Sequence, residues 1–192
     1  MFGRSSIRAA AAAALLTLAA AGCGSSPKDE AASLLSAGLK AHTAGKLDEA
    51  LTKYRRVLML DPKNHFAFYN IGLIAQTQGR TGEAEFNYRQ ALTLSPNYTP
   101  ALYNLALVRA AAGGRAEAVE LYKKVIAVND ADASAHFNLG LLLVQMGKVA
   151  AGTAELKKAF KLNPELAARV PSDVAKKTAK PLPRRSPTAA PG

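Results

Sequence analysis

Hydrophobic and small residues follow a helical spacing along the chain. They recur at i, i+3, i+4 and i+7 in two stretches, which are Leu34, Ala37, Gly38 and Ala41, and then Phe68, Ile71, Gly72 and Ala75. With 3.6 residues per turn, this spacing places all four side chains of a stretch on one face of an α-helix. The pattern therefore predicts two helices that each bury one stripe.

The pattern returns with a fixed period of 34 residues. Aligned without a gap, the chain divides into four segments, which are residues 31–64, 65–98, 99–132 and 133–166. Position 15, counted from the first residue of each segment, is always a glycine: Gly45, Gly79, Gly113 and Gly147. A period of this length indicates one supersecondary unit that stacks on copies of itself.

Each segment predicts a hairpin of two helices. The glycine at position 15 ends the first helix, because glycine enters the left-handed conformation without a Cβ clash. In the second segment a further stripe of Ala84, Tyr88 and Ala91 marks a second helix, which ends before Pro96 because proline has no N–H to donate. Positions 8 and 20 hold only glycine or alanine, so we expect the two helices to approach closely there.

The order of small, aromatic and proline residues resembles the tetratricopeptide repeat. Residues 38–62 carry the skeleton G-x6-G-x4-A-x3-Y-x7-P, and its positions recur through residues 31–166. The resemblance implies an all-α fold, a right-handed α-solenoid of four helix-turn-helix repeats whose first helices form a concave face.

The resemblance also implies where a partner binds, because positions 5, 6 and 9 of the first helix commonly point into the concave groove. An asparagine amide offers a donor and an acceptor to the backbone of an extended peptide, and an aromatic side chain adds apolar area with little rotamer entropy to lose. The expected groove consists of Tyr69, Asn70, Leu73, Tyr103, Asn104, Leu107, Phe137, Asn138 and Leu141.

A second interpretation of these positions stays open. The asparagines then only tie neighbouring repeats together, and the residue at position 5 packs against the next hairpin. Some co-chaperone members of the family clamp a C-terminal carboxylate with lysine and arginine on their first helices. Leu35, Pro100 and Asn104 stand at those positions here, so that activity is not expected.

The N-terminus has the composition of a secretory signal. Two arginines precede an apolar run over residues 9–21, which is shorter than the roughly 20 residues that span a bilayer. Cys23 is the single cysteine and stands where bacterial lipoproteins carry their lipidated residue. We expect a lipoprotein-type signal peptide in residues 1–22, then lipidated Cys23 and a flexible tether to residue 30. Two alternatives are cleavage at an Ala-x-Ala site and retention of the segment as a weak anchor.

The formal net charge of +11 is concentrated at the C-terminal end. Residues 167–192 contain six basic residues, one acid and five prolines, which predicts an extended, disordered tail. The tail either keeps the protein soluble or is attracted to anionic lipid or cell-wall polymer. After Pro164 only residues 165–170 are expected to be helical, so we expect no capping helix. The exposed end of the fourth repeat then invites self-association or partner docking.

The sequence offers no constellation of catalytic or metal-binding residues. His42, His65 and His136 fall at different positions of their repeats, without a pair at i, i+4 or a carboxylate cluster, and we expect each at a helix surface or edge. We therefore expect no enzyme activity, no cofactor and no metal. A nucleic-acid partner is not expected outside the cytosol.

These patterns together indicate a membrane-anchored interaction scaffold or assembly factor of the bacterial cell envelope, facing the periplasm or the cell exterior, whose groove binds a protein or peptide. The alternative is a protein that binds anionic lipid or cell-wall polymer through its basic tail, with the repeats as a spacer. Salt distinguishes the two, because binding to a polyanion weakens steeply with ionic strength.

Overall fold

The structure is a computed structural model that describes residues 26–179 of the 192-residue chain. Every secondary-structure element of this part of the chain is helical. The elements are α1 (Pro27–Thr43), α2 (Leu47–Leu60), α3 (His65–Thr77), α4 (Thr81–Leu94), α5 (Thr99–Ala111), α6 (Arg115–Val128), α7 (Ala133–Gln145), α8 (Val149–Leu162), the 3-10 helix η1 (Pro164–Arg169) and α9 (Ser172–Ala179). Residues 1–25, with the expected signal peptide and Cys23, and residues 180–192 lie outside the described residues.

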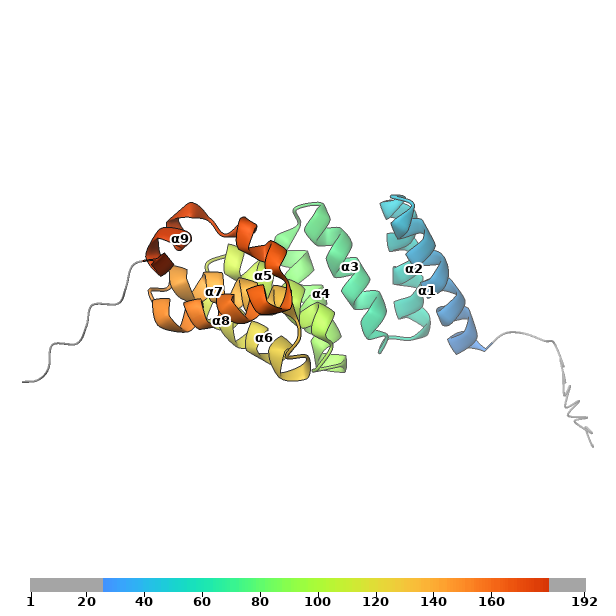
Figure 1. The fold of residues 1–192 in the computed structure, drawn as a ribbon. Helices are drawn as coiled ribbons and strands as arrows, with labels where there is room; N and C mark the ends of the chain where they lie inside the picture. Colours follow the sequence, from blue (N-terminus) through green and yellow to red (C-terminus); the bar gives the residue numbers. More distant parts are fainter. Residues whose placement is uncertain (1–25, 180–192) are drawn as a thin grey trace, which may run out of the picture.

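The helices form four hairpins that stack in chain order, so that the two ends of the described chain lie at opposite ends of the stack (Figure 1). The hairpins are α1–α2, α3–α4, α5–α6 and α7–α8, and the second helix of each hairpin packs against the first helix of the next. The prediction of four helical hairpins with a period of 34 residues is confirmed.

The turn inside each hairpin is set by its glycine. Gly45, Gly79, Gly113 and Gly147 have φ angles of 74°, 72°, 83° and 80°, in the left-handed region. After α1, Gly45 N donates to His42 O and Lys46 N donates to Ala41 O, each at 2.9 Å. These two bonds are the Schellman pair that satisfies the last carbonyls of a helix. The same role was predicted for the glycine at position 15.

The two helices of a hairpin approach closely where the side chains are smallest. A Cβ added to Gly38 would lie 2.6 Å from Tyr54 Cε1, and one added to Gly72 would lie 2.7 Å from Tyr88 Cε1. Both tyrosines are fully buried. The aromatic ring therefore fills the space that the missing side chain leaves, as the sequence predicted.

The fourth hairpin packs more tightly still, because it has glycine on both helices. A Cβ on Gly152 would lie 2.6 Å from Gly140 O, a backbone atom that cannot rotate away. Leu156 stands where the other repeats have a buried tyrosine and is itself buried. Two glycines and a smaller side chain let the backbones of α7 and α8 come together.

The first helix begins earlier than the sequence predicted. α1 starts at Pro27, so residues 27–30, which we expected in a flexible tether, are helical. Ser26 Oγ accepts from Asp29 N at 3.2 Å, and the Asp29 carboxylate accepts from Ser26 N at 3.0 Å. This reciprocal pair is a capping box, and proline is well suited to the first position after the cap.

The end of the fourth repeat is covered, which corrects the expectation of an uncapped repeat and of a tail that is disordered from residue 167. η1 packs against α8, and α9 packs against α7 and α8. Leu166 and Val174 are 3% and 0% exposed. Pro171 does not stop the chain from being helical, because its carbonyl accepts the Ala175 N–H at 2.9 Å. The exposed end on which we based self-association is therefore absent from residues 26–179.

Candidate functional site

The tyrosines and asparagines of the expected groove bond to one another across neighbouring repeats. Asn104 Nδ2 on α5 donates to Tyr69 Oη on α3 at 3.2 Å. Asn138 Nδ2 on α7 donates to Tyr103 Oη on α5 at 2.6 Å. Each bond joins residues 35 apart in sequence, which is one repeat plus one residue. These contacts are the ones described by the second interpretation, in which the asparagines tie the repeats together.

The same amides still have unused bonding capacity. Each asparagine amide carries two N–H donors and one carbonyl acceptor. Within residues 26–179 no protein donor bonds to Oδ1 of Asn104 or Asn138, and neither oxygen is buried without a partner. These two side chains can therefore hold the repeats together and still present an acceptor on the face formed by the first helices.

Asn70 lies in different surroundings from the other two asparagines. It is 7% exposed, and its Nδ2 donates to Phe66 O in its own helix at 2.8 Å. The residue at position 5 of the preceding repeat is Leu35, which has no hydroxyl to accept a bond. The predicted three-rung asparagine ladder is thus two inter-repeat rungs and one buried side chain.

The C-terminal segment covers the groove positions of the fourth repeat. Phe137 is 5% exposed and packs in one apolar cluster with Leu166 and Val174, and Leu141 packs against that cluster. The Arg169 guanidinium lies 5.9 Å from the centre of the Phe137 ring. Position 5 of this repeat therefore contacts the following helical segment instead of solvent.

An open cavity of about 380 Å³ remains on this face along the third repeat, between the second and the fourth. All of its lining residues come from the first helices α3, α5 and α7 or from the residue preceding α7. They are Tyr69, Thr99, Pro100, Tyr103, Asn104, Asp132 and Ser134. Leu73 and Leu107 lie on the same helices and are half-buried against the core. Three of the nine predicted groove residues line this cavity.

Burial alters the two tyrosine hydroxyls of the cavity. It raises the pKa of Tyr69, against the smaller lowering effect of the Asn104 hydrogen bond. Burial also raises the pKa of Tyr103, the Asp132 carboxylate raises it further, and the bonds to Asn138 and Ser134 oppose this. Both phenols therefore stay protonated at neutral pH and can donate a hydrogen bond to a ligand.

An aromatic cluster closes the corresponding place one repeat earlier. The ring of Tyr98 lies 5.2 Å from that of Tyr69 and 5.6 Å from that of Phe66, in edge-to-face geometry. His65 stacks on Phe66 with the ring centres 3.9 Å apart. Phe66 is 44% exposed. The sequence analysis did not predict this cluster. Its signal is position 34, the last residue of each repeat, where the second repeat has Tyr98 and the third has Asp132.

His136 is a buried residue, which corrects its expected place at a helix surface or edge. It is 3% exposed, with Nδ1 2.6 Å from Glu155 Oε2 on α8 and Nε2 3.0 Å from Asp130 O. It occupies position 4, where the other repeats have Leu34, Phe68 and Leu102. The apolar residues at this position in the other repeats were the signal for burial. The contacts of His136 join α7 to α8 and to the preceding turn.

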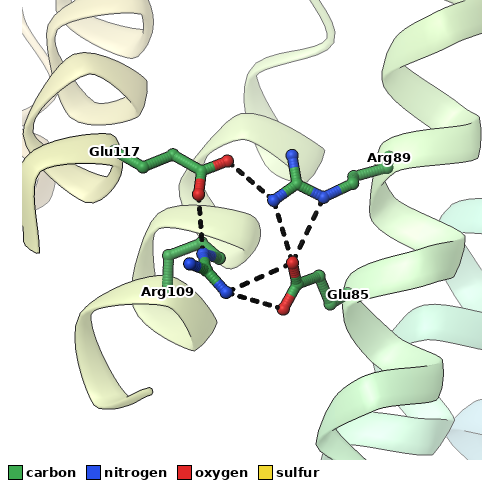
Figure 2. A network of polar contacts seen from close by, with 4 residues as sticks. All are labelled: Glu85, Arg89, Arg109 and Glu117. Carbon is green, nitrogen blue, oxygen red and sulfur yellow. Dashed lines mark hydrogen bonds and ion pairs between the residues drawn. The ribbon is translucent and has the colours of Figure 1, made fainter. Parts of the chain in front are cut away.

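Four charged residues connect the second and third repeats (Figure 2). Arg109 on α5 pairs with Glu85 on α4 at 3.1 Å and with Glu117 on α6 at 2.7 Å. Arg89 on α4 pairs with the same two carboxylates at 2.8 and 2.7 Å. Hydrogen bonds from Arg89, with a smaller contribution from Arg109, lower the pKa of Glu85, and burial opposes them.

In residues 26–179 no group of three histidine, cysteine, aspartate or glutamate residues is placed to hold a metal ion. None of the helices described here has both the length and the apolar character needed to cross a membrane.

The fold and its hairpin turns define a helical-repeat protein of the α-solenoid class. Sequence models of the TPR repeat match residues 38–79 and 115–147, and those of the tetratricopeptide repeat match residues 67–98, 100–129 and 133–166. The chain belongs to the tetratricopeptide repeat family. The all-α fold, a right-handed solenoid of four repeats, is thereby confirmed. No curated protein sequence matches this chain.

Solved structures of this family resemble the chain in fold. A MamA fragment from Desulfovibrio magneticus RS-1 has 23% identity and a TM-score of 0.67, with 79% of this chain and 90% of that chain covered. YrrB, described as a TPR protein with an unusual peptide-binding site, has 18% identity, a TM-score of 0.67, and coverages of 79% and 82%. The first TPR of Spaghetti (RPAP3), bound to the HSP90 peptide SRMEEVD, has 24% identity, a TM-score of 0.58, and coverages of 62% and 94%.

Proposed function

We propose that this protein is an interaction scaffold or assembly factor of the bacterial cell envelope, which holds an extended segment of a partner protein against its first helices. Tetratricopeptide repeat proteins are typically scaffolds without enzyme activity, and structural neighbours such as the RPAP3 repeat and YrrB are described with peptides. These findings support a protein or peptide partner. Attachment to the membrane through lipidated Cys23 completes the proposal and rests on the sequence.

The observation that carries the proposal is the open cavity beside Tyr69 and Tyr103. An extended segment needs hydrogen-bond partners for its backbone and apolar surface for its side chains. The cavity offers two phenol hydroxyls and the Asn104 carbonyl, and half-buried Leu73 and Leu107 lie on the same two helices. In the fourth repeat the C-terminal segment covers Phe137 and Leu141, so the proposed contact is centred on the second and third repeats.

The test fills the cavity and leaves both tyrosine–asparagine bonds between repeats in place. Ser134 is exposed at the cavity edge, and Ser134→Tyr adds a ring there, while Ser33→Tyr adds the same ring to an exposed position on α1. Crosslinking followed by pull-down from envelope membranes should lose a defined protein partner in Ser134→Tyr alone. If both variants keep the same partners, the cavity is not the binding site.

Membrane attachment needs its own measurement. If Cys23 is lipidated, the chain takes up a clickable fatty acid during growth and fractionates with membranes, and Cys23→Ala loses both properties. Two lipid signals anchor a protein firmly, because each buried CH₂ contributes about 0.8 kcal/mol. Uptake of the label by Cys23→Ala would exclude this residue as the anchor and leave the scaffold proposal intact.

A second function has one structural observation in its favour. Basic side chains continue from the C-terminal sequence onto the last helices, where Lys157, Lys161, Lys176 and Lys177 are exposed. Such a surface attracts anionic lipid or cell-wall polymer with about 1 kcal/mol per basic residue near a membrane. Partner retention that disappears between low and high salt would favour this function, whereas a cavity of hydroxyls and amides responds weakly to salt.

A further inference from the structure

The cavity beside Tyr69 and Tyr103 has an uneven charge. Of its lining residues, Asp132 is the one that carries a charge, and the others are hydroxyl, amide or proline side chains. Asp132 Oδ1 accepts the Ala135 N–H at 2.9 Å. Among residues 26–179 no lysine, arginine or histidine nitrogen lies within 4.0 Å of this carboxylate. The carboxylate therefore faces the cavity without an ionic partner from the described chain.

Asp132 also distinguishes this junction from the previous one. Position 34 of the second repeat is Tyr98, at the junction of the second and third repeats, where its ring packs against Tyr69 and Phe66. The change from an aromatic ring to a short carboxylate at the same position removes the apolar contact and introduces a negative charge. The chain thus has a filled aromatic junction followed by an open acidic one.

The walls of the cavity suit a positive group. The rings of Tyr69 and Tyr103 have electron-rich faces that attract cations. Both hydroxyl oxygens accept hydrogen bonds from asparagine amides, and that of Tyr69 can accept a second one. Asn104 adds a free carbonyl oxygen. A group with several N–H donors would find acceptors on three sides.

Three positive features oppose this preference. The N-termini of α5 and α7 each carry roughly half a positive charge. Asp132 is the cap of α7 and compensates for the charge of that helix. Arg169 lies over Phe137, beyond the lining residues. At the Tyr103 hydroxyl the negative Asp132 has a larger effect on the pKa than the positive Arg169 does, after burial. Of the charged side chains near the Tyr103 hydroxyl, the negative one therefore dominates.

We propose that this cavity receives the guanidinium or ammonium group of an arginine or lysine side chain from the extended partner segment. This inference rests on the proposed function and adds to it the chemistry by which a partner is selected. It is opposite in sign to recognition of an acidic C-terminus, for which this face would need basic residues.

The test changes charge but not the helix cap. Asparagine caps a helix about as well as aspartate, so Asp132→Asn should keep α7 intact. Asp130→Asn makes the same change two residues away, at an exposed side chain that does not line the cavity. The probe is a synthetic random peptide library in four pools, with the central residue fixed as arginine, lysine, leucine or glutamate.

The full chain should retain the arginine and lysine pools above the leucine and glutamate pools. Asp132→Asn should weaken retention of the arginine pool by about tenfold, the size expected for one charge-assisted contact, while Asp130→Asn should not. Arg169→Gln removes the opposing charge and should strengthen the same preference.

Each other outcome has a separate meaning. Equal retention of the four pools, or a preference that survives in Asp132→Asn, overturns the assignment of a cationic ligand and leaves peptide binding standing. A preference for the glutamate pool reverses the inference. If no pool is retained by the unmodified chain, both this inference and the peptide groove are wrong.

Discussion

The junction between the second and third repeats and the C-terminal end of the stack solve the same packing problem with different chemistry. At the junction, four charged side chains and the Tyr69 to Asn104 bond connect the helices, and a cavity that extends from Tyr69 to Ser134 stays open. At the end, Leu166 and Val174 close over Phe137, and the equivalent face is covered. Polar contacts hold repeats together without filling the groove, whereas apolar burial fills it.

The largest effect is expected where the apolar end is broken. Leu166 is 3% exposed, and Leu166→Ala should lower the free energy of unfolding by about 2–5 kcal/mol, because it removes buried methyl groups and leaves a cavity. Leu162→Ala is the matched control, since Leu162 is 44% exposed. Urea unfolding followed by circular dichroism measures both. Equal effects of the two substitutions would mean that η1 does not hold the end of the stack.

A glycine substitution separates helix propensity from packing. Gly152→Ala gains about 1 kcal/mol of propensity but places a Cβ 2.6 Å from Gly140 O. We expect the contact to dominate, with a net loss of about 1–3 kcal/mol, since the backbone cannot move aside cheaply. Gly82→Ala has open space around it and should stabilise by about 0.4–1 kcal/mol. Stabilisation by Gly152→Ala in thermal unfolding would contradict the close approach of α7 and α8.

The inter-repeat bonds should have a smaller effect. Tyr103→Phe deletes the hydroxyl that accepts from Asn138 and should cost about 0.5–1.5 kcal/mol. Tyr98→Phe removes a hydroxyl that forms no hydrogen bond within residues 26–179, and it should leave the unfolding midpoint unchanged. A double-mutant cycle of Tyr103→Phe with Asn138→Ala gives the pairwise energy, and additivity of the two substitutions would show that the bond contributes nothing.

The charged network should give the smallest effect and a recognisable pH dependence. Because its arginine partners lower the pKa of Glu85 in the folded protein, the stabilisation is present above the ordinary glutamate pKa of about 4.3 and is lost as the pH falls through the lower folded value. Melting temperatures measured across acidic pH should therefore fall less steeply in Glu85→Gln. The difference should shrink at high salt, as it does for half-exposed pairs.

The repeat architecture was predictable because one residue type at one position has one physical role. Four glycines with positive φ and small residues facing Tyr54 and Tyr88 follow directly from the period of 34. The C-terminal cap was not predictable in this way. Pro171 indicates a break by its missing N–H, but its carbonyl still starts α9, and burial of Val174 decides the outcome.

The site was predictable in position but not in contacts. The resemblance to the tetratricopeptide repeat implied that Tyr69, Tyr103 and Asn104 share one face, and the structure gathers them around a cavity. It could not show that Asn138 is bonded to Tyr103, because partners 35 residues apart form no local pattern. Asp132 was missed for a related reason: its role in the cavity depends on side chains from three different helices.

The spacing of the tyrosine–asparagine bonds has a consequence for how the length of this protein can change in evolution. Removal of residues 99–132 would delete one whole period and place Asn138 where Asn104 now stands, opposite Tyr69. The same bond could re-form in a chain that is one unit shorter, while a deletion of any other length would leave both side chains without their partners. Such a bond favours gain and loss of repeats in whole units. Duplication of a whole repeat preserves the spacing of the two partners, whereas a small insertion between them changes it.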